Sequence, residues 1–132
     1  MIASGNLEAV RVERLKDRSQ FLKIAASGIK WVAPGLVMQV RSLQGDSDSH
    51  NLIRIGFTTS KKVGNAVERN RARRRLRELA REIIPARSRP GYEYVLIGRK
   101  ATINRAYDKL RLDLETALKR LKTVRDKPEP QA

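Results

Sequence analysis

The first half of the chain contains two segments in which apolar and more polar positions alternate, which is the pattern of half-buried β-strands. These segments span residues 35–43 and 53–60, and the polar run 44–51 between them is typical of a turn. Their repeating apolar positions are Leu36, Met38, Val40, Ile53, Ile55 and Phe57. We therefore expect the two strands to pair as an antiparallel hairpin. A shorter extended segment at residues 29–33 precedes them.

Other segments carry apolar side chains at helical spacing. Helices are predicted at residues 17–27, 66–84 and 104–123. In the first helix, Asp17 is a natural N-cap with Gln20 at the capping-box position, and Gly28 suits the end of the helix.

The second helix has the same capping pattern at Asn65 and Glu68, and Pro85 is expected to end it. The regular spacing of the last helix includes Ile103, just before its expected start. Residues 92–98 are largely apolar, which is typical of a strand in the interior of a sheet.

The expected elements follow the order αβββαβα, which predicts an α+β sandwich built from one sheet and its helices. A chain of 132 residues suits one domain, which we expect to span residues 14–123. Residues 1–13 are expected to be a flexible N-terminal arm and residues 124–132 a disordered tail, because their charges and prolines bury little apolar surface.

The charge of the chain is strongly unbalanced, with 29 Lys and Arg residues against 14 acidic ones and a formal net charge of +15. A protein this basic attracts polyanions, so nucleic acid and an anionic membrane surface are the candidate partners. Membrane binding would require large apolar anchors, yet aromatic residues make up only 5% of the chain. Nucleic acid is therefore the favoured partner.

The chain has no cysteine, which excludes thiol catalysis and sulfur-ligated metal sites and is typical of a reducing compartment. The N-terminal residues lack the apolar stretch of a secretory signal. No apolar run approaches the ~20 residues that span a bilayer. We therefore expect a cytoplasmic protein.

The most basic segment, residues 61–77, holds eight Lys or Arg residues and one acid. On a helical wheel its apolar stripe, which is expected to pack on the sheet, consists of Ala72, Leu76, Leu79, Ala80 and Ile83. One flank has no acid and consists of Asn70, Arg74, Arg77 and Arg81. The opposite flank consists of Arg71, Arg75, Glu78 and Glu82. There, Arg75 and Glu78 can pair across one turn, so this flank is expected to be self-neutralised.

The acid-free flank is the candidate nucleic-acid surface, because arginine forks match phosphate oxygens and also stack on bases. Lys61, Lys62 and the backbone amides near Gly64 stand just before the helix. The positive end of the helix dipole is there too, which favours a bound phosphate.

The stretch from residue 56 to residue 78, GFTTSKKVGNAVERNRARRRLRE, closely resembles the signature of the bacterial ribonuclease P protein family. It has a glycine at the strand end, a Ser-Lys-Lys turn, Gly-Asn-Ala-Val, and an Arg-Asn-Arg triplet that opens the helix. Further arginines of the family fall at Arg74 and Arg77, and the resemblance in element order covers about residues 14–123.

The resemblance implies the protein subunit of an RNA-based endonuclease that removes the 5′ leader from precursor tRNA. The catalytic RNA would supply the magnesium-dependent chemistry and hold most of the magnesium, and the isolated protein would be inactive. The implied partners are the catalytic RNA, in a 1:1 complex, and precursor tRNA, with no membrane and no protein partner. The implied fold is a two-layer αβββαβα sandwich with a left-handed βαβ crossover, like the second domain of a small-subunit ribosomal protein.

The resemblance also implies roles for individual residues. It implies that the protein has no catalytic residue and no metal ligand. The implied RNA-binding residues are Lys61, Lys62, Arg69, Asn70, Arg71, Arg73, Arg74 and Arg77. A cleft for the leader, between the first helix and the sheet, would be lined by Phe21, Val37 and Gln39. Ala25 and Gln39 replace aromatic residues found in other members, so leader contacts are expected to use hydrogen bonds and less stacking.

Three other functions remain open on the sequence. A ribosomal or other structural RNA-binding protein would explain the charge and the size, but not the signature stretch. A duplex-DNA reader would prefer DNA to structured RNA at matched salt. A protein-only nuclease would cleave precursor tRNA without any RNA subunit.

The remaining candidate residues carry weaker signals. His50 lacks the convergent partners of a catalytic or metal site. Asp46 and Asp48 suit a solvated loop better than a calcium site, because the rest of the EF-hand pattern is absent. Trp31 is interpreted as a half-buried strand residue in preference to a base-stacking platform.

Overall fold

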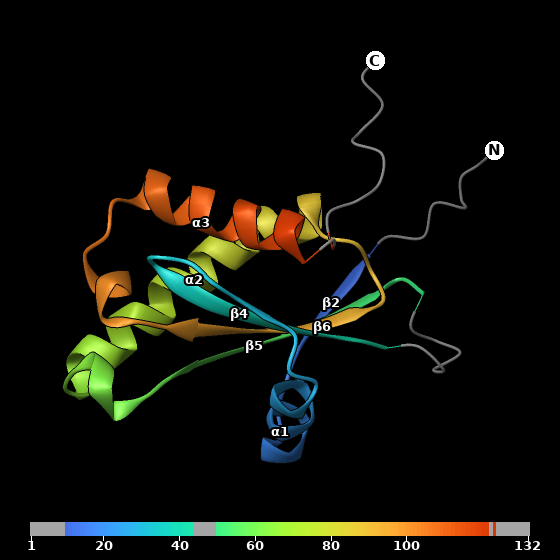
Figure 1. Cartoon of the computed structure of the whole chain (residues 1–132), viewed down its shortest axis with the longest axis horizontal. Helices are drawn as coiled ribbons and strands as arrows, with labels where there is room; N and C mark the ends of the chain where they lie inside the picture. Colours follow the sequence, from blue (N-terminus) through green and yellow to red (C-terminus); the bar gives the residue numbers. More distant parts are fainter. Residues whose placement is uncertain (1–9, 44–49, 122, 124–132) are drawn as a thin grey trace.

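The computed structural model describes residues 10–43, 50–121 and 123, and its elements are shown in Figure 1. The strands are β2 (Arg11–Arg14), β3 (Lys30–Val32), β4 (Leu36–Ser42), β5 (Leu52–Thr59) and β6 (Tyr92–Gly98). The α-helices are α1 (Arg18–Ala26), α2 (Ala66–Arg87) and α3 (Tyr107–Arg120). Two 3-10 turns, η1 (Lys61–Val63) and η2 (Lys100–Ile103), precede α2 and α3. The expected order αβββαβα is present, with one additional strand before it.

The five strands form one sheet in the order β2-β5-β6-β4-β3. The predicted hairpin of β4 with β5 is wrong, because β6 lies between them, antiparallel to β4 and parallel to β5. The interior position predicted for β6 is confirmed. Four of its residues in a row are buried, so both faces of the strand are covered at the centre of the sheet. Helix α2 joins the parallel neighbours β5 and β6 and completes a βαβ unit.

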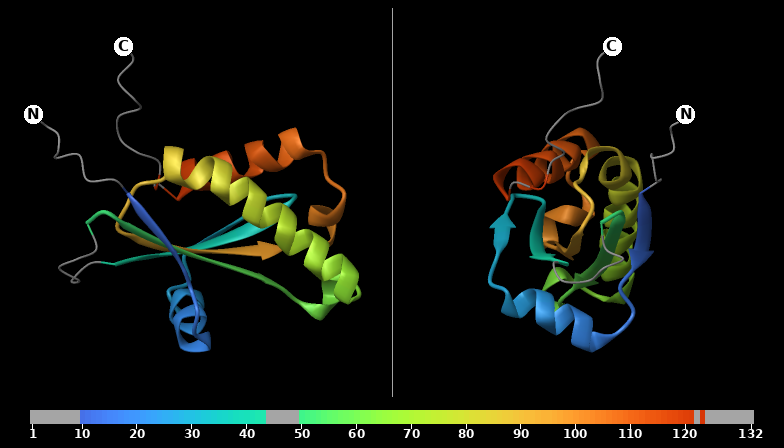
Figure 2. Two further views of the ribbon diagram at one scale, coloured as in Figure 1. Left: turned by 180° about the vertical axis from the view of Figure 1, so that it is seen from behind. Right: turned by 90° about the vertical axis from the view of Figure 1, so that its right-hand side faces the viewer.

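Helices α2 and α3 cover one face of the sheet, and the short helix α1 lies against the other face (Figures 1 and 2). The main core is formed where the buried side of β4, β5 and β6 meets the apolar stripes of α2 and α3. A smaller cluster, built around Ile24 and Val95, lies under α1. The predicted alternation in β4 is confirmed, because Leu36, Met38 and Val40 are buried while the residues between them are not.

The N-terminal arm predicted for residues 1–13 is wrong at its C-terminal end, because Arg11–Arg14 forms the edge strand β2, parallel to β5. All four residues of β2 are exposed, and Val12 is the one apolar residue among them, so no run of alternating apolar positions marks the strand in the sequence. Backbone hydrogen bonds hold it, including Arg11 N–H to the Asn51 carbonyl at 2.8 Å and Leu15 N–H to the Ile55 carbonyl at 2.9 Å. Residues 1–9 of the arm, the tail 124–132, and residues 44–49 with Asp46 and Asp48 lie outside the described residues.

Helices α1 and α2 begin where the capping pattern predicts, but the end of α2 and the start of α3 differ from the prediction. Gln20 accepts a hydrogen bond from Asp17 N–H at 3.1 Å, and Gly28 has the positive φ of 74° expected after the end of α1. Helix α2 runs two residues beyond Pro85, because the buried Ile84 anchors its last turn and accepts a hydrogen bond from Ser88 N–H at 3.0 Å.

Helix α3 is shorter than predicted, because residues 100–103 form the separate turn η2. Ile103, which fits the helical spacing of the sequence, instead packs with Val63 and Ala72 in a small cluster at the start of α2. The turn η2 therefore belongs to the surroundings of α2 and not to α3.

Candidate nucleic-acid interface

The basic stretch begins in the turn η1, where Lys61 and Lys62 are both exposed. The predicted capping box then starts α2: Glu68 N–H donates to Asn65 Oδ1 at 2.8 Å, and Asn65 N–H donates to Glu68 Oε1 at 2.9 Å. Gly64 N–H donates to the Lys61 carbonyl at 3.3 Å. The amides of Gly64 and Asn65 therefore have acceptors within the protein, and the phosphate site predicted at this helix start, beside the exposed Lys61 and Lys62, stays a prediction.

The apolar stripe predicted for α2 is confirmed, because Ala72, Leu76, Leu79, Ala80 and Ile83 are all buried. This burial fixes the rotation of the helix about its axis. One flank of α2 consequently faces the β5 and β2 edge of the sheet, and the other flank faces η2 and α3.

The flank on the β5 side, here called the arginine flank, consists of Asn70, Arg73, Arg74, Arg77 and Arg81. Arg73 donates to Thr59 Oγ1 at 3.0 Å and to the Asn70 side-chain oxygen. The guanidinium groups of Arg74, Arg77 and Arg81 have neither a hydrogen-bond acceptor nor a carboxylate partner among the residues that the structure describes. Three guanidinium groups on one helix side are thus left uncompensated, which creates a strongly positive surface.

Two other predicted RNA-binding residues of α2 have contacts within the protein. Arg69 lies at the start of the helix and donates to the Gly64 carbonyl at 2.8 Å, which ties the helix to the turn before it. Arg71 lies on the side opposite the arginine flank, where its Nε donates to the Ile103 carbonyl at 3.0 Å. The structure therefore groups Asn70, Arg73, Arg74 and Arg77, and sets Arg71 apart from them.

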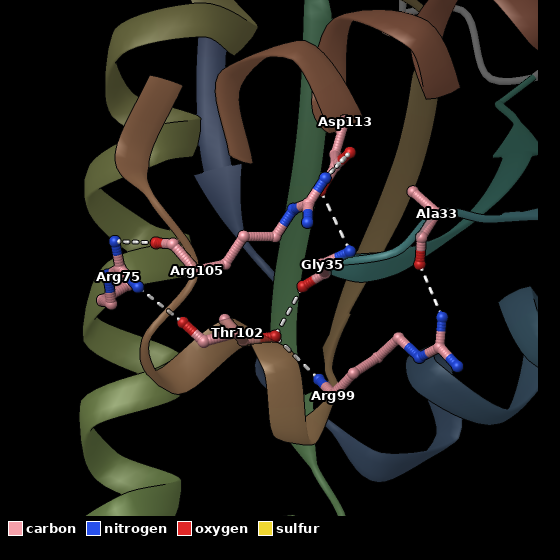
Figure 3. Close-up of polar contacts among 7 residues, drawn as sticks. All are labelled: Ala33, Gly35, Arg75, Arg99, Thr102, Arg105 and Asp113. Carbon is pink, nitrogen blue, oxygen red and sulfur yellow. Dashed lines mark hydrogen bonds and ion pairs between the residues drawn. The ribbon is translucent and has the colours of Figure 1, made fainter. Parts of the chain in front are cut away.

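The predicted pairing of Arg75 with Glu78, which would have neutralised this flank of α2, is wrong. Instead, the Arg75 guanidinium donates to the carbonyls of Thr102 at 2.8 Å and Arg105 at 2.7 Å (Figure 3). It also donates to the Ile103 carbonyl at 3.1 Å. Carbonyls at the end of a 3-10 turn lack backbone donors, and a guanidinium can satisfy several of them at once. This flank therefore holds α2 against η2 and has a structural role.

A buried polar network continues from this contact to the turn between β3 and β4 (Figure 3). Asp113, whose side chain is 6% exposed, accepts hydrogen bonds from Arg105 Nε at 2.7 Å and from Gly35 N–H at 2.9 Å. Thr102 Oγ1 donates to the Gly35 carbonyl at 2.6 Å. The network joins α3, η2 and the β3–β4 turn, and so it fixes the carbonyls that hold Arg75.

A second feature lies on the opposite face of the sheet, where a hollow of about 430 Å³ is lined by residues of α1 and of the strands beside it. It is here called the α1 hollow, and its lining includes Phe21 and Gln39 together with Ala25, Val95 and Ile97. Val37 lies outside this lining, although it pairs with Ile97 in the sheet and is half-buried beside the hollow. Two of the three predicted leader-cleft residues thus meet in one hollow.

The position of Phe21 depends on a glycine in the strand beneath it. A Cβ added to Gly56 would lie 2.5 Å from the Phe21 ring, so a larger residue there would force the ring away from the sheet. Glycine at this place in β5 is what lets an aromatic side chain of α1 pack directly on the strand.

Two arginines near these features were missed in the sequence. Among the described residues that line the α1 hollow, Arg18 is the only charged one, and its spacing to Phe21 across one turn of α1 was an available signal. Arg14 places its guanidinium carbon 5.6 Å from the centre of the Phe57 ring. No local signal predicts this second contact, because it depends on the pairing of β2 with β5.

Perturbed pKa values occur outside these two features. Burial raises the pKa of Tyr94, in the core, to about 12. Burial and a hydrogen bond to Glu82 raise the pKa of Tyr107.

In the described part of the chain, no three His, Asp or Glu side chains are grouped so that they could hold a metal ion. His50 is exposed.

Trp31 occupies a half-buried strand position, as predicted, and lies under the Arg120 guanidinium, whose central carbon is 5.4 Å from the ring centre. None of the described helices is long and apolar enough to cross a bilayer.

The fold and this surface define a small, strongly basic α+β protein with an uncompensated arginine surface on one long helix. The family model Ribonuclease P matches residues 10–122. The ribonuclease P protein component of Paramagnetospirillum magneticum is 51% identical over 113 residues, which cover 86% of this chain and 85% of that protein. The corresponding protein of Ruegeria pomeroyi is 51% identical over 108 residues, 81% of this chain and 84% of that protein.

Solved structures show the same similarity. The RNase P protein of Staphylococcus aureus superimposes with a TM-score of 0.68 at 25% identity, covering 85% of this chain and 97% of that one. The RNase P protein of Thermotoga maritima superimposes with a TM-score of 0.66 at 28% identity, covering 81% and 96%. This chain belongs to the ribonuclease P protein family.

Proposed function

We propose that this chain binds the catalytic RNA of ribonuclease P in a 1:1 complex and helps it to remove the 5′ leader from precursor tRNA. The observation that carries the proposal is the arginine flank, which is uncompensated within the described residues of a chain belonging to this family. Arg74 and Arg77, with Lys61 and Lys62 before the helix, would contact phosphates, and Asn70 and Arg73 would position them.

The α1 hollow suits the single-stranded leader. Its floor is apolar and includes the Phe21 ring, on which a base can stack, while Arg18 at its side can contact a phosphate. Gln39 offers both a donor and an acceptor to a base edge. None of the described residues in its lining carries a carboxylate that would repel the RNA strand.

We assign the hydrolytic chemistry to the catalytic RNA and its magnesium ions. To the protein we assign the role of lowering the electrostatic repulsion between the catalytic RNA and precursor tRNA. Two RNA molecules repel each other strongly, and a chain with a net charge of +15 placed between them reduces this repulsion. Lower repulsion would allow the complex to form at less magnesium. We place this activity in the cytoplasm, in agreement with the absence of cysteine.

Replacing Phe21 with alanine should weaken binding of precursor tRNA by the reconstituted enzyme about tenfold, which is the usual value of one aromatic–base stack. Binding of mature tRNA, which lacks the leader, should not change. The two affinities are measured with wild-type and variant protein at one salt concentration. Leu112→Ala, an exposed apolar residue on α3, serves as the control and should change neither affinity. Equal losses for precursor and mature tRNA would contradict the leader assignment.

A further inference from the structure

A second hollow, of about 240 Å³, lies on the face of the sheet that carries α2. It is here called the β2 hollow, because it lies where the edge strand β2 and the neighbouring β5 face the arginine flank. Its apolar lining includes Val12, Ile55, Phe57 and Ala80. Of these, Ile55 and Ala80 are buried, whereas Val12 is exposed and Phe57 half-buried. Apolar side chains that stay open to solvent beside a charged rim are characteristic of a binding site.

The charged residues that line the β2 hollow, among those the structure describes, are Arg14, Arg77 and Arg81. No carboxylate of the described residues belongs to this lining. Glu13, the acid nearest to it along the chain, points to the other face of the sheet and lies 3.7 Å from the Arg54 guanidinium. Glu78 and Glu82 lie on the opposite flank of α2. The hollow therefore favours an anionic ligand that also has a flat apolar part.

Phe57 and Arg14 give the hollow a specific chemistry. The Arg14 guanidinium lies 5.6 Å from the centre of the Phe57 ring, so a planar cation and an aromatic ring already stack at its edge. Both groups are partners on which nucleic acid bases stack, and single-stranded RNA is usually recognised in this way. A nucleotide combines the base that fits the floor with the phosphate that fits the rim.

We propose that the β2 hollow binds one unpaired nucleotide of the catalytic RNA, with its base against Phe57 and Val12 and its phosphate between Arg77 and Arg81. This inference rests on the proposed function. The catalytic RNA is the source because Arg77 and Arg81 continue the arginine flank, so an RNA lying along that flank passes directly over the hollow. The leader, in contrast, is assigned to the α1 hollow on the other face of the sheet, whose lining shares Phe57 with the β2 hollow and otherwise consists of different residues.

The absence of cysteine from the chain allows a crosslinker to be attached at one chosen position. Val12→Cys, labelled with an azidophenacyl group and bound to the ribonuclease P RNA with precursor tRNA present, should crosslink to one unpaired nucleotide of the ribonuclease P RNA. Val12 is 43% exposed on an edge strand, so the label can be accommodated. Leu112→Cys, 62% exposed on α3, carries the same label as the control and should not crosslink to the RNA.

The crosslinked nucleotide is then replaced by an abasic one, which removes the base and keeps the phosphate. Affinity for the wild-type protein should fall about tenfold. With Val12→Trp, which fills the hollow without changing the charge, or with Arg81→Ala, abasic and intact RNA should bind with more nearly equal affinity.

Crosslinks only to precursor tRNA or only within the protein would overturn the inference. An abasic RNA that binds wild-type protein as tightly as intact RNA would overturn it too, because the contact would then involve the backbone alone. Failure of wild-type protein to bind the ribonuclease P RNA at all would instead overturn the proposed function, and this result is visible before any variant is tested.

Discussion

Replacing Arg74 and Arg77 together with alanine should weaken binding of the catalytic RNA at least about a hundredfold at low salt. Each side chain is expected to make a charge-assisted contact to a phosphate, and such a contact contributes about 1.5–3 kcal/mol. Neither guanidinium has an internal partner among the described residues, so its removal leaves no buried group unsatisfied. The fold should therefore remain intact, and the loss should appear in RNA affinity alone.

The salt dependence of binding separates a phosphate contact from a general effect of charge. The slope of log affinity against log salt should become flatter by about two, close to one for each lost phosphate contact. The matched control is Arg87→Ala with Arg111→Ala, which removes two arginines that already pair with Glu115 and Glu82. This control should change the slope much less. An unchanged slope in the Arg74 and Arg77 variant would place both arginines off the interface.

Replacing Asp113 with alanine should lower the free energy of unfolding by about 3 kcal/mol, because it removes one partner of a buried ion pair. Arg105 would lose its carboxylate, which its Nε contacts at 2.7 Å, and Gly35 N–H would lose its acceptor. For a domain of this size, the midpoint of thermal unfolding should fall by roughly 10 °C. Circular dichroism with urea and with heat measures both quantities.

Two further variants identify the cause of that loss. Asp108→Ala, an exposed acid on the same helix, should cost no more than about 1 kcal/mol. Asp113→Asn keeps an acceptor for Gly35 N–H but removes the charge that faces Arg105, so its effect should lie between the other two. A loss of less than about 1 kcal/mol for Asp113→Ala would show that the network in Figure 3 contributes little to stability.

Local patterns in the sequence located most elements, but they could not select the strand partners. The alternation of apolar positions identifies β4 and β5, whereas the insertion of β6 between them depends on which strand can be buried on both faces. The strand Arg11–Arg14 had no pattern to detect, because all four side chains are exposed and backbone hydrogen bonds hold it.

The same distinction applies to the surface of α2. Helical geometry is local, so the wheel correctly separated the buried stripe from the flank with Arg74 and Arg77. The carbonyl contacts of Arg71 and Arg75 depend on η2, which lies about thirty residues further along the chain, and no spacing rule predicts them. The β2 hollow likewise depends on the parallel pairing of β2 with β5.

The most direct test of the central claim is cleavage of precursor tRNA by components that are purified separately. RNA-free protein, ribonuclease P RNA, and both together are compared at a magnesium concentration too low for the RNA alone. We predict 5′ leader removal only when both are present, with no cleavage by the protein. Cleavage by the RNA-free protein, or no gain when protein is added to the RNA, would contradict the assignment of this chain as a protein cofactor of a catalytic RNA.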